Sequence, residues 1–181
     1  MVELQSGMTT ENNAGSYGAI LLRNQLKDLI KSPVDGFSVG LVDDSNIYEW
    51  QVMIEGPSGT LFEGGLFPAL LKFPSSYPNS PPTMIFQTPD FWHPNVYPDG
   101  RVCISILHEA KEDAFNQQES MEEKWRPILG VESILISVVS LLSDPNLESP
   151  ANIDASINLL RDPEGYRKRI RRLVRRSVEM I

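Results

Sequence analysis

The sequence predicts an α+β domain with a four-stranded antiparallel meander sheet flanked by about four helices. Apolar residues alternate with other residues through residues 37–41 and 48–54, and two further short strands are indicated at 66–73 and 83–86. Helical spacing instead marks residues 19–31 and the last third of the chain. One helix, then a run of strands, then helices favours a meander of strands with helices packed beside it.

The first helix is predicted from residue 19, because apolar residues then recur at helical spacing up to Ile30. It ends at Ser32-Pro33, since the residue before a proline disfavours helical backbone. The cluster Asp43-Asp44-Ser45-Asn46 is typical of a turn, so the two strands around it form an antiparallel hairpin.

The third and fourth strands lie between breaks in the pattern. Gly64-Gly65 precedes the third strand, and Pro74, Pro78, Pro81 and Pro82 separate it from the fourth. Residues 87–127 then show no long regular period, and loops of that length are usually functional or disordered. This region is therefore the first place to search for a site.

Three helices are predicted to close the chain. A strong apolar stripe runs from Val131 to Leu142 and stops at Asp144-Pro145-Asn146. A shorter helix covers residues 151–160. Asp162-Pro163 then supplies an N-cap and a proline at the first helical position, which predicts the start of the last helix.

Length and composition indicate one soluble globular domain of 181 residues. Residues 1–18 are interpreted as a flexible N-terminal extension and residues 19–181 as the core domain. A single cysteine excludes an intramolecular disulfide and indicates a reduced compartment. No transmembrane segment and no secretory signal are visible, so a cytoplasmic or nuclear location is expected.

The net charge of −8 is unevenly placed, with +5 in residues 161–181 and −13 in the remainder. The acidic body argues against general binding of nucleic acid, although a basic partner is compatible with it. The last helix carries seven basic residues between Tyr166 and Arg176. A membrane-surface or nuclear element and a merely solvated face are both open, and the solvated face is the simpler interpretation.

Cys103 is the lone cysteine, so a metal site built on paired cysteines is excluded. A buried inert thiol is the first possibility. A protease nucleophile is the second, and it needs His93 or His108 as a base. A thioester carrier is the third; it needs an accessible thiol, a donor for the oxyanion and no strong base beside the sulfur.

The residues around Cys103 resemble the signature of ubiquitin-conjugating enzymes, in which the active cysteine follows the histidine of His-Pro-Asn by ten positions, as Cys103 follows His93. The resemblance continues in family order on both sides and covers roughly residues 18–180. Its other motifs are Tyr77-Pro78-Asn79-Ser80-Pro81-Pro82, Trp125-Arg126-Pro127 and Ser140-Leu141-Leu142-Ser143-Asp144-Pro145-Asn146. The resemblance implies the UBC fold.

Trp125 lies 22 residues after Cys103, an insertion of roughly 14 relative to short family members. Together with the sequence Cys103-Ile104-Ser105-Ile106-Leu107-His108, this longer spacing resembles the long acidic-loop class called the G type. That class typically builds degradative ubiquitin chains with RING ligases.

The resemblance implies roles for individual residues. Cys103 would accept ubiquitin from the activating enzyme as a thioester and pass it to lysine amines with a ligase. Asn95 would stabilise the oxyanion or brace the active-site loop, and both roles are open beside the plainer one of a turn residue. His93 is expected to pack the loop structurally rather than to act as a base.

Ser105 and Ser149 stand where many relatives carry aspartate, so two carboxylates that could prepare an incoming lysine are missing. Our hypothesis is that the inserted acidic loop supplies them through Glu112-Asp113, which align with the acidic pair of the class, as His108 aligns with its histidine. A merely solvated acidic loop is the alternative. Ser149 is also a candidate for phosphorylation.

The surface facing the ligase and the activating enzyme is expected on the first helix, on the loop of residues 77–82 and after the insertion. Its residues would be Arg23, Lys27, Asn79, Trp125, Pro127 and Ile128. Asn79 replaces the usual aromatic residue of the family. Trp125 could instead belong to the core, and Arg23 and Lys27 to a solvated face.

The resemblance further implies a monomer that binds no cofactor, with ATP used upstream by the activating enzyme. Recruitment to the surface of the endoplasmic reticulum by partners is a further expectation. Three alternative functions remain open: conjugation of a ubiquitin-like modifier, a non-catalytic ubiquitin-binding variant of the fold, and a cysteine protease with a histidine next to Cys103.

Overall fold

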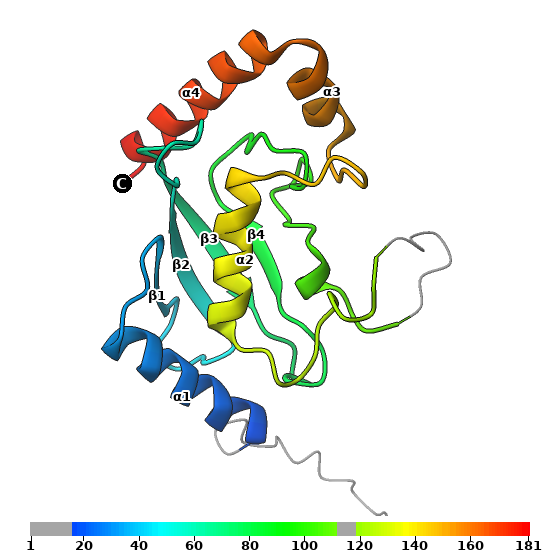
Figure 1. Ribbon diagram of the computed structural model, residues 1–181. Coiled ribbons are helices and arrows are strands. Elements are labelled where there is room, and N and C mark those ends of the chain that lie inside the picture. The colour runs from blue at the N-terminus through cyan, green and yellow to red at the C-terminus, as the bar shows by residue number, and fades with distance from the viewer. Residues whose placement is uncertain (1–15, 112–118) are drawn as a thin grey trace, which may run out of the picture.

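Four antiparallel strands form one sheet in the order β1-β2-β3-β4 (Figure 1). The structure is a computed structural model that describes residues 16–111 and 119–181. The strands are β1 (Phe37–Leu41), β2 (Glu49–Glu55), β3 (Leu66–Lys72) and β4 (Thr83–Phe86). Each strand pairs with the next one along the chain, so the predicted meander is confirmed.

Four α-helices flank this sheet in the described part of the chain, as predicted. They are α1 (Tyr17–Lys31), α2 (Val131–Ser143), α3 (Ile153–Arg161) and α4 (Pro163–Glu179). Figure 1 shows α2 crossing one face of the sheet, with α1 and α4 at opposite ends of the molecule. Asp162 caps α4 by accepting a hydrogen bond from the Gly165 amide, and Pro163 occupies the first turn.

The first helix begins at Tyr17, two residues before the predicted start of the core domain. Ser16 is its N-cap: the hydroxyl oxygen accepts a hydrogen bond from the Ala19 amide at 3.2 Å. The same hydroxyl lies 2.7 Å from the Tyr48 hydroxyl. Residues 17 and 18 therefore join the helix, whereas residues 1–15 of the proposed extension lie outside the described residues.

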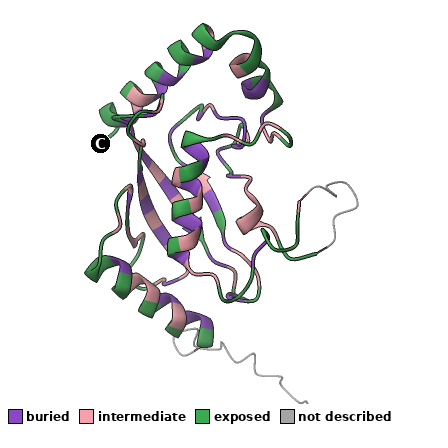
Figure 2. Cartoon of the chain, viewed as in Figure 1, coloured by how far each residue is buried: buried purple, intermediate pink, exposed green. Residues whose placement is uncertain are grey.

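The core lies between the sheet and α2. Alternate residues of β2 and β3 are buried and face α2, whose own buried residues follow helical spacing (Figure 2). Burial of each large aliphatic side chain contributes about 1.5–3 kcal/mol. The fully buried members of this layer are Trp50, Val52, Ile54, Phe67, Ala69, Leu71, Val131, Ile134, Leu135 and Val138.

The chain that carries Cys103 is held against the edge of the sheet. Isolated bridges join Ile85 to Arg101 and Val96 to Val102. Gly100 makes the turn between them with a φ of 92°, and a Cβ there would lie 2.4 Å from the Phe86 carbonyl oxygen. This close approach fixes where the chain emerges, three residues before Cys103.

The helices of the described segments include none that is both long and apolar enough to span a membrane.

Candidate functional site

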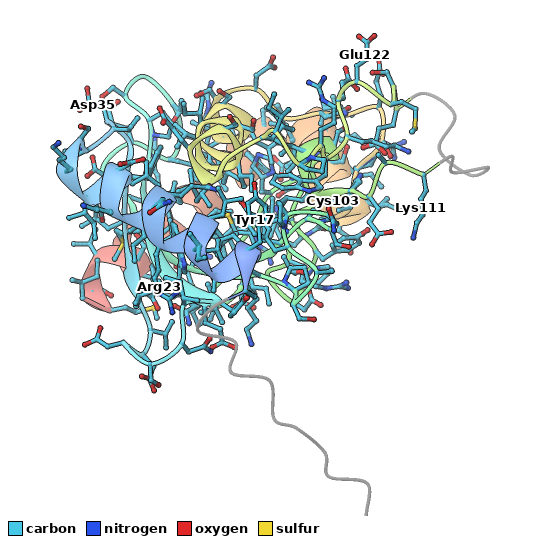
Figure 3. The ribbon with its side chains drawn as sticks, turned by 90° about the horizontal axis from the view of Figure 1, so that it is seen from below. Tyr17, Arg23, Asp35, Cys103, Lys111 and Glu122 are labelled. Carbon is cyan, nitrogen blue, oxygen red and sulfur yellow. The ribbon has the colours of Figure 1, made fainter. Side chains whose placement is uncertain are left out.

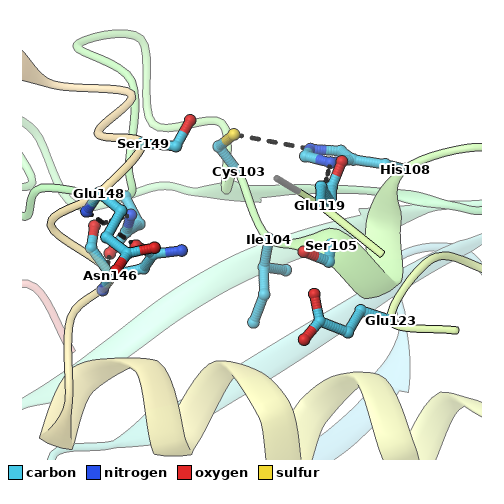
Figure 4. Close-up of a pocket in the computed structure, with 10 residues that line it drawn as sticks. Cys103, Ile104, Ser105, His108, Glu119, Glu123, Asn146, Glu148 and Ser149 are labelled. Carbon is cyan, nitrogen blue, oxygen red and sulfur yellow. Dashed lines mark hydrogen bonds and ion pairs between the residues drawn. The ribbon is translucent and has the colours of Figure 1, made fainter. Parts of the chain in front are cut away.

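Cys103 is a half-buried free thiol at a pocket of about 210 Å³ (Figure 4). Its backbone amide donates a hydrogen bond to the Asn95 carbonyl oxygen at 2.9 Å, which ties the cysteine to the His-Pro-Asn turn. The site is thus accessible rather than sealed in the core. The pocket is lined by Asn95, Cys103, Ile104, Ser105, His108, Glu119, Glu123, Asn146, Glu148 and Ser149.

The Asn95 side chain joins the cysteine loop to the segment after α2. Its Nδ2 donates to the Asn146 carbonyl oxygen at 2.7 Å, and its Oδ1 accepts from the Asn146 amide at 2.8 Å. Both ends of the buried amide therefore engage one backbone unit 51 residues away. This geometry braces the loop, and one Nδ2 hydrogen stays available to a second acceptor.

His93 lies beneath this turn and is fully buried. Its Nδ1 accepts a hydrogen bond from the Asn95 amide at 2.9 Å, so its Nε2 donates to the Leu141 carbonyl oxygen at 3.0 Å. Burial lowers the pKa of His93 to about 4. The ring is neutral at pH 7 and links α2 to the active-site turn.

His108 stands beside the thiol. Its Nε2 lies 3.5 Å from Cys103 Sγ, and its Nδ1 lies 2.7 Å from Glu119 Oε1 (Figure 4). The hydrogen bond to Cys103, with help from Glu119 and against partial burial, raises the pKa of His108 to about 9. The ring is thus mostly protonated at neutral pH, and an imidazolium stabilises negative charge on the adjacent sulfur.

We expected that a thioester carrier would have no basic side chain beside its sulfur. The structure contradicts this expectation, because the imidazole of His108 lies 3.5 Å from Cys103 Sγ. Since His108 already carries its proton at neutral pH, it is not a free base in the unloaded protein. The contact also meets the geometric requirement stated for the cysteine-protease alternative. Geometry alone leaves both kinds of sulfur-based acyl transfer open.

Glu119 and Lys124 are residues whose roles sequence reasoning missed. Burial opposes ionisation of Glu119, but hydrogen bonds from Ser105 and His108, with Lys124 nearby, hold the pKa of its carboxyl below the usual value. Lys124 is buried and donates to the Lys111 carbonyl oxygen at 2.7 Å. Glu119 lies in the acidic loop, and nothing in the local sequence signals its pairing with His108.

Tyr97 is another residue that the sequence did not single out. Negative charge on Cys103 is the first cause of a raised pKa of Tyr97, and the Arg101 guanidinium lies 4.9 Å from the centre of its ring. The phenol therefore lies within electrostatic reach of the thiol, on the side of the turn that precedes Cys103.

The structure brings together some of the predicted supporting residues. Ser105 and Ser149 both line the pocket, and Ser149 is exposed. Glu112 and Asp113, the proposed source of loop carboxylates, lie outside the described residues. Among the described carboxylates that line the pocket, Glu119 is linked to Cys103 through His108.

The predicted ligase-facing residues fall into two groups. Trp125 is 2% exposed, donates to the Pro78 carbonyl oxygen at 2.8 Å and packs on Tyr77, so it belongs to the core. The others lie at the surface: Arg23, Lys27, Asn79, Pro127 and Ile128, the last 87% exposed. Figure 3 shows Arg23 on α1, apart from Cys103.

Within residues 16–111 and 119–181, His, Cys, Asp and Glu side chains form no group of three suited to a metal ion. The arrangement at Cys103 offers a nucleophile, an adjacent imidazole and a braced loop. Such a set can form and break an acyl bond to sulfur.

Residues 21–174 match the family model described as "Ubiquitin-conjugating enzyme". The chain is 57% identical over 161 residues to Ubiquitin-conjugating enzyme E2 15 of Schizosaccharomyces pombe, covering 89% of this chain and 95% of that protein. It is 55% identical over 165 residues to Ubiquitin-conjugating enzyme E2 13 of Arabidopsis thaliana, covering 91% and 98%. The structure of human Ubiquitin-conjugating enzyme E2 G1 matches with a TM-score of 0.63 and 53% identity, covering 71% of this chain and 97% of that one.

Proposed function

This chain belongs to the ubiquitin-conjugating enzyme family, and we propose that Cys103 is the residue on which it carries ubiquitin as a thioester. Ubiquitin conjugation is the activity of the family, so ubiquitin, an activating enzyme and a ligase are its partners in general. The observation that supports the assignment to Cys103 is an accessible thiol on the braced turn, with His108 against its sulfur. The cysteine-protease alternative has no support from the relatives.

Transfer proceeds in two steps on this proposal. Cys103 first attacks the thioester of the activating enzyme and takes over the ubiquitin carboxyl-terminal acyl group. A lysine amine then attacks the new thioester and forms an amide bond, with Cys103 as the leaving group. ATP is spent upstream by the activating enzyme, and the chain itself needs no metal and no organic cofactor.

Asn95 has two parts in this scheme. The brace to Asn146 holds the loop next to Cys103 and keeps the amide in place. Its remaining Nδ2 hydrogen is the donor we assign to the oxyanion that forms when the lysine attacks. A donor held by a buried hydrogen-bond pair needs little reorganisation at the moment of reaction.

We assign the ligase and the activating enzyme to the surface formed by α1 and the loops near Trp125. Ile128 supplies the most exposed apolar side chain of the predicted set, whereas Trp125 supports the loop from inside. Arg23, Lys27 and Asn79 complete the polar part of this surface. A RING ligase, degradative chains, a monomeric state and a cytoplasmic or nuclear location are proposed on the class resemblance.

A loading assay tests the proposal. The protein is incubated with activating enzyme, ATP and ubiquitin, and the products are separated without reductant and with thiol. A thiol-labile adduct is expected, and Cys103→Ser should replace it with a thiol-stable oxyester. A thiol-stable adduct in the parent protein, or an adduct that persists in Cys103→Ala, would contradict the assignment, because Cys103 is the one cysteine in the chain. Absence of any adduct with ubiquitin would favour a ubiquitin-like modifier or a non-catalytic role.

A further inference from the structure

A series of three side chains leads from the second half of the inserted segment to the sulfur of Cys103. Lys124 Nζ lies 3.7 Å from Glu119 Oε2, Glu119 Oε1 lies 2.7 Å from His108 Nδ1, and His108 Nε2 lies 3.5 Å from the sulfur. The side chains of Lys124, Glu119 and His108 are 3%, 9% and 35% exposed, so exposure increases toward the pocket. The interior end of the series is fixed and the pocket end is open to a substrate.

The hydrogen bonds decide which nitrogen of His108 can take a proton. An ionised carboxylate accepts hydrogen bonds only, so Nδ1 of His108 carries the hydrogen that Glu119 accepts. In the neutral ring the lone pair is then on Nε2, the atom that faces the sulfur. The arrangement aims the basic atom of the imidazole at the place where the thioester forms.

We propose that His108 is the group that takes the proton of the attacking lysine amine, and that Glu119 and Lys124 are positioning residues that hold it there. The inference rests on the proposed thioester at Cys103. His108 would thus accept the proton in a protein that has serine, and no carboxylate, at positions 105 and 149.

Aminolysis of the Cys103 thioester is balanced in protons and electrons on this proposal. The lysine nitrogen attacks the carbonyl carbon of the thioester, and its proton passes to Nε2 of His108. The carbon–sulfur bond breaks, and Cys103 leaves with the bonding electrons as a thiolate. The products are an amide and a thiolate beside a protonated imidazole. The contact between these two groups is also the largest cause of the raised pKa of His108 in the unloaded protein.

The protonation of His108 changes between the unloaded protein and the thioester. The hydrogen bond to the Cys103 sulfur is the largest cause that keeps His108 protonated before loading. A thioester sulfur is a poor hydrogen-bond acceptor, so loading weakens the largest cause that holds the proton on the ring. His108 therefore becomes able to accept a proton only after ubiquitin is in place.

Several charges around His108 set the pH at which it titrates. Glu119 favours the protonated ring, and Lys124, itself close to Glu119, weakens that effect. Two further carboxylates line the same pocket. The titratable and charged groups that face the site are Cys103, Glu119, Lys124, Glu123, Glu148 and Tyr97.

The experiment measures discharge of preformed ubiquitin thioester to free lysine in a single turnover between pH 6 and 9. His108→Gln should lower the rate at pH 7 on the order of 100-fold, the usual contribution of a general base. In the parent protein the rate should rise more steeply than first order in hydroxide until His108 has titrated, because the amine and the ring must both be neutral. In His108→Gln the rate should rise only in first order with hydroxide, because the amine alone must lose a proton.

Glu119→Gln separates charge from position. Glutamine still accepts the hydrogen bond from Nδ1, so the ring keeps its orientation. Loss of the carboxylate charge should move the break in the pH profile to lower pH. Lys124→Met should lower the rate at every pH, because the carboxylate loses its anchor. Glu122→Gln, an exposed change of the same charge outside the pocket, is the matched control and should leave the profile unchanged.

Thermal unfolding and the rate of loading are measured for every variant. An unchanged rate and profile in His108→Gln would overturn the inference, as would a break that Glu119→Gln and Glu122→Gln leave at the same pH. If His108→Gln folds but does not load, the ring acts on the thiol and the inference is also wrong. Failure of the parent protein to form any thiol-labile adduct would instead remove the proposed function.

Discussion

His93 shows how a buried polar side chain can support a turn. Each ring nitrogen has one partner, the Asn95 amide on one side and the Leu141 carbonyl oxygen on the other. A second proton would have to sit on Nδ1, where the Asn95 amide already points its own hydrogen. Protonation therefore costs burial of a charge and one hydrogen bond.

Stability should consequently fall in acid in a way that depends on His93. Burial lowers the folded pKa of His93 to about 4, below the unfolded value near 6.5, so the unfolded chain binds more protons between these values. The free energy of unfolding should drop by about 3 kcal/mol from this group as the pH falls from 6.5 toward 4. Urea unfolding at pH 7 and pH 5 measures part of this drop.

The test for this effect compares the parent protein with His93→Gln. The variant lowers stability at pH 7, and its further loss between pH 7 and pH 5 should be smaller, because no titrating group remains at that position. Equal losses in the two proteins would show that other groups carry the acid sensitivity.

Local sequence could predict some members of the site and not others. Cys103 and Asn95 lie within one short motif, where spacing along the chain is informative. Other contacts of the site join residues outside that motif: Asn146 lies 51 residues from Asn95, and Glu119 lies 11 residues from His108. Side-chain pairing of this kind depends on tertiary structure and leaves no periodic signal.

The helices and strands were predictable because each follows a simple period. β2 (Glu49–Glu55) alternates between buried and less buried positions, and α2 (Val131–Ser143) buries residues at helical spacing. Two helix starts lie two residues from their predicted positions: α3 begins at Ile153 rather than at residue 151, and α1 begins at Tyr17, after the Ser16 cap that contacts Tyr48, 32 residues away. Element interiors follow from local pattern, whereas their ends depend on tertiary partners.

The turn at Gly100 connects these elements to the site, and two glycines allow its role to be tested. Gly100 and Gly64 both have positive φ, but a Cβ at Gly64 meets nothing within 4 Å whereas one at Gly100 meets the Phe86 carbonyl oxygen. Gly64→Ala should lose ~1–2 kcal/mol from backbone strain alone. Gly100→Ala should lose at least ~1 kcal/mol more, because the backbone must also move apart.

Thermal unfolding and the loading rate of Cys103 measure the two effects of these substitutions. Only Gly100→Ala should slow loading, since it displaces the hydrogen bond from the Phe86 amide to the Gly100 carbonyl oxygen. Equal stability losses for the two variants would indicate that φ strain alone matters at this turn.

The molecule as a whole is organised around α2. Its buried face covers the sheet, its Leu141 carbonyl oxygen holds His93, and the chain beyond it supplies Asn146 to the cysteine loop. Helix α4 contacts the start of β3, where the Ser177 hydroxyl oxygen accepts a hydrogen bond from the Leu66 amide. The pocket at Cys103 therefore depends on the same layer of contacts that holds the fold.

Neighbouring residues of α2 should respond very differently to truncation. Leu135 is fully buried between α2 and the sheet, so Leu135→Ala should cost about 2–5 kcal/mol of unfolding free energy. Ile136 is 46% exposed, and Ile136→Ala should cost less than ~1 kcal/mol. Urea unfolding checks both, and similar losses for the two variants would contradict the described packing of α2.

The solitary thiol also makes the pocket addressable by chemistry. Cys103 is the one cysteine in the chain and is only half-buried, so a maleimide fluorophore or spin label attaches at a single known point without any other cysteine being replaced. The label would be positioned beside His108 and the brace at Asn95. Its emission or mobility would then report on events at the pocket mouth, including the approach of a partner protein, in an otherwise unmodified chain.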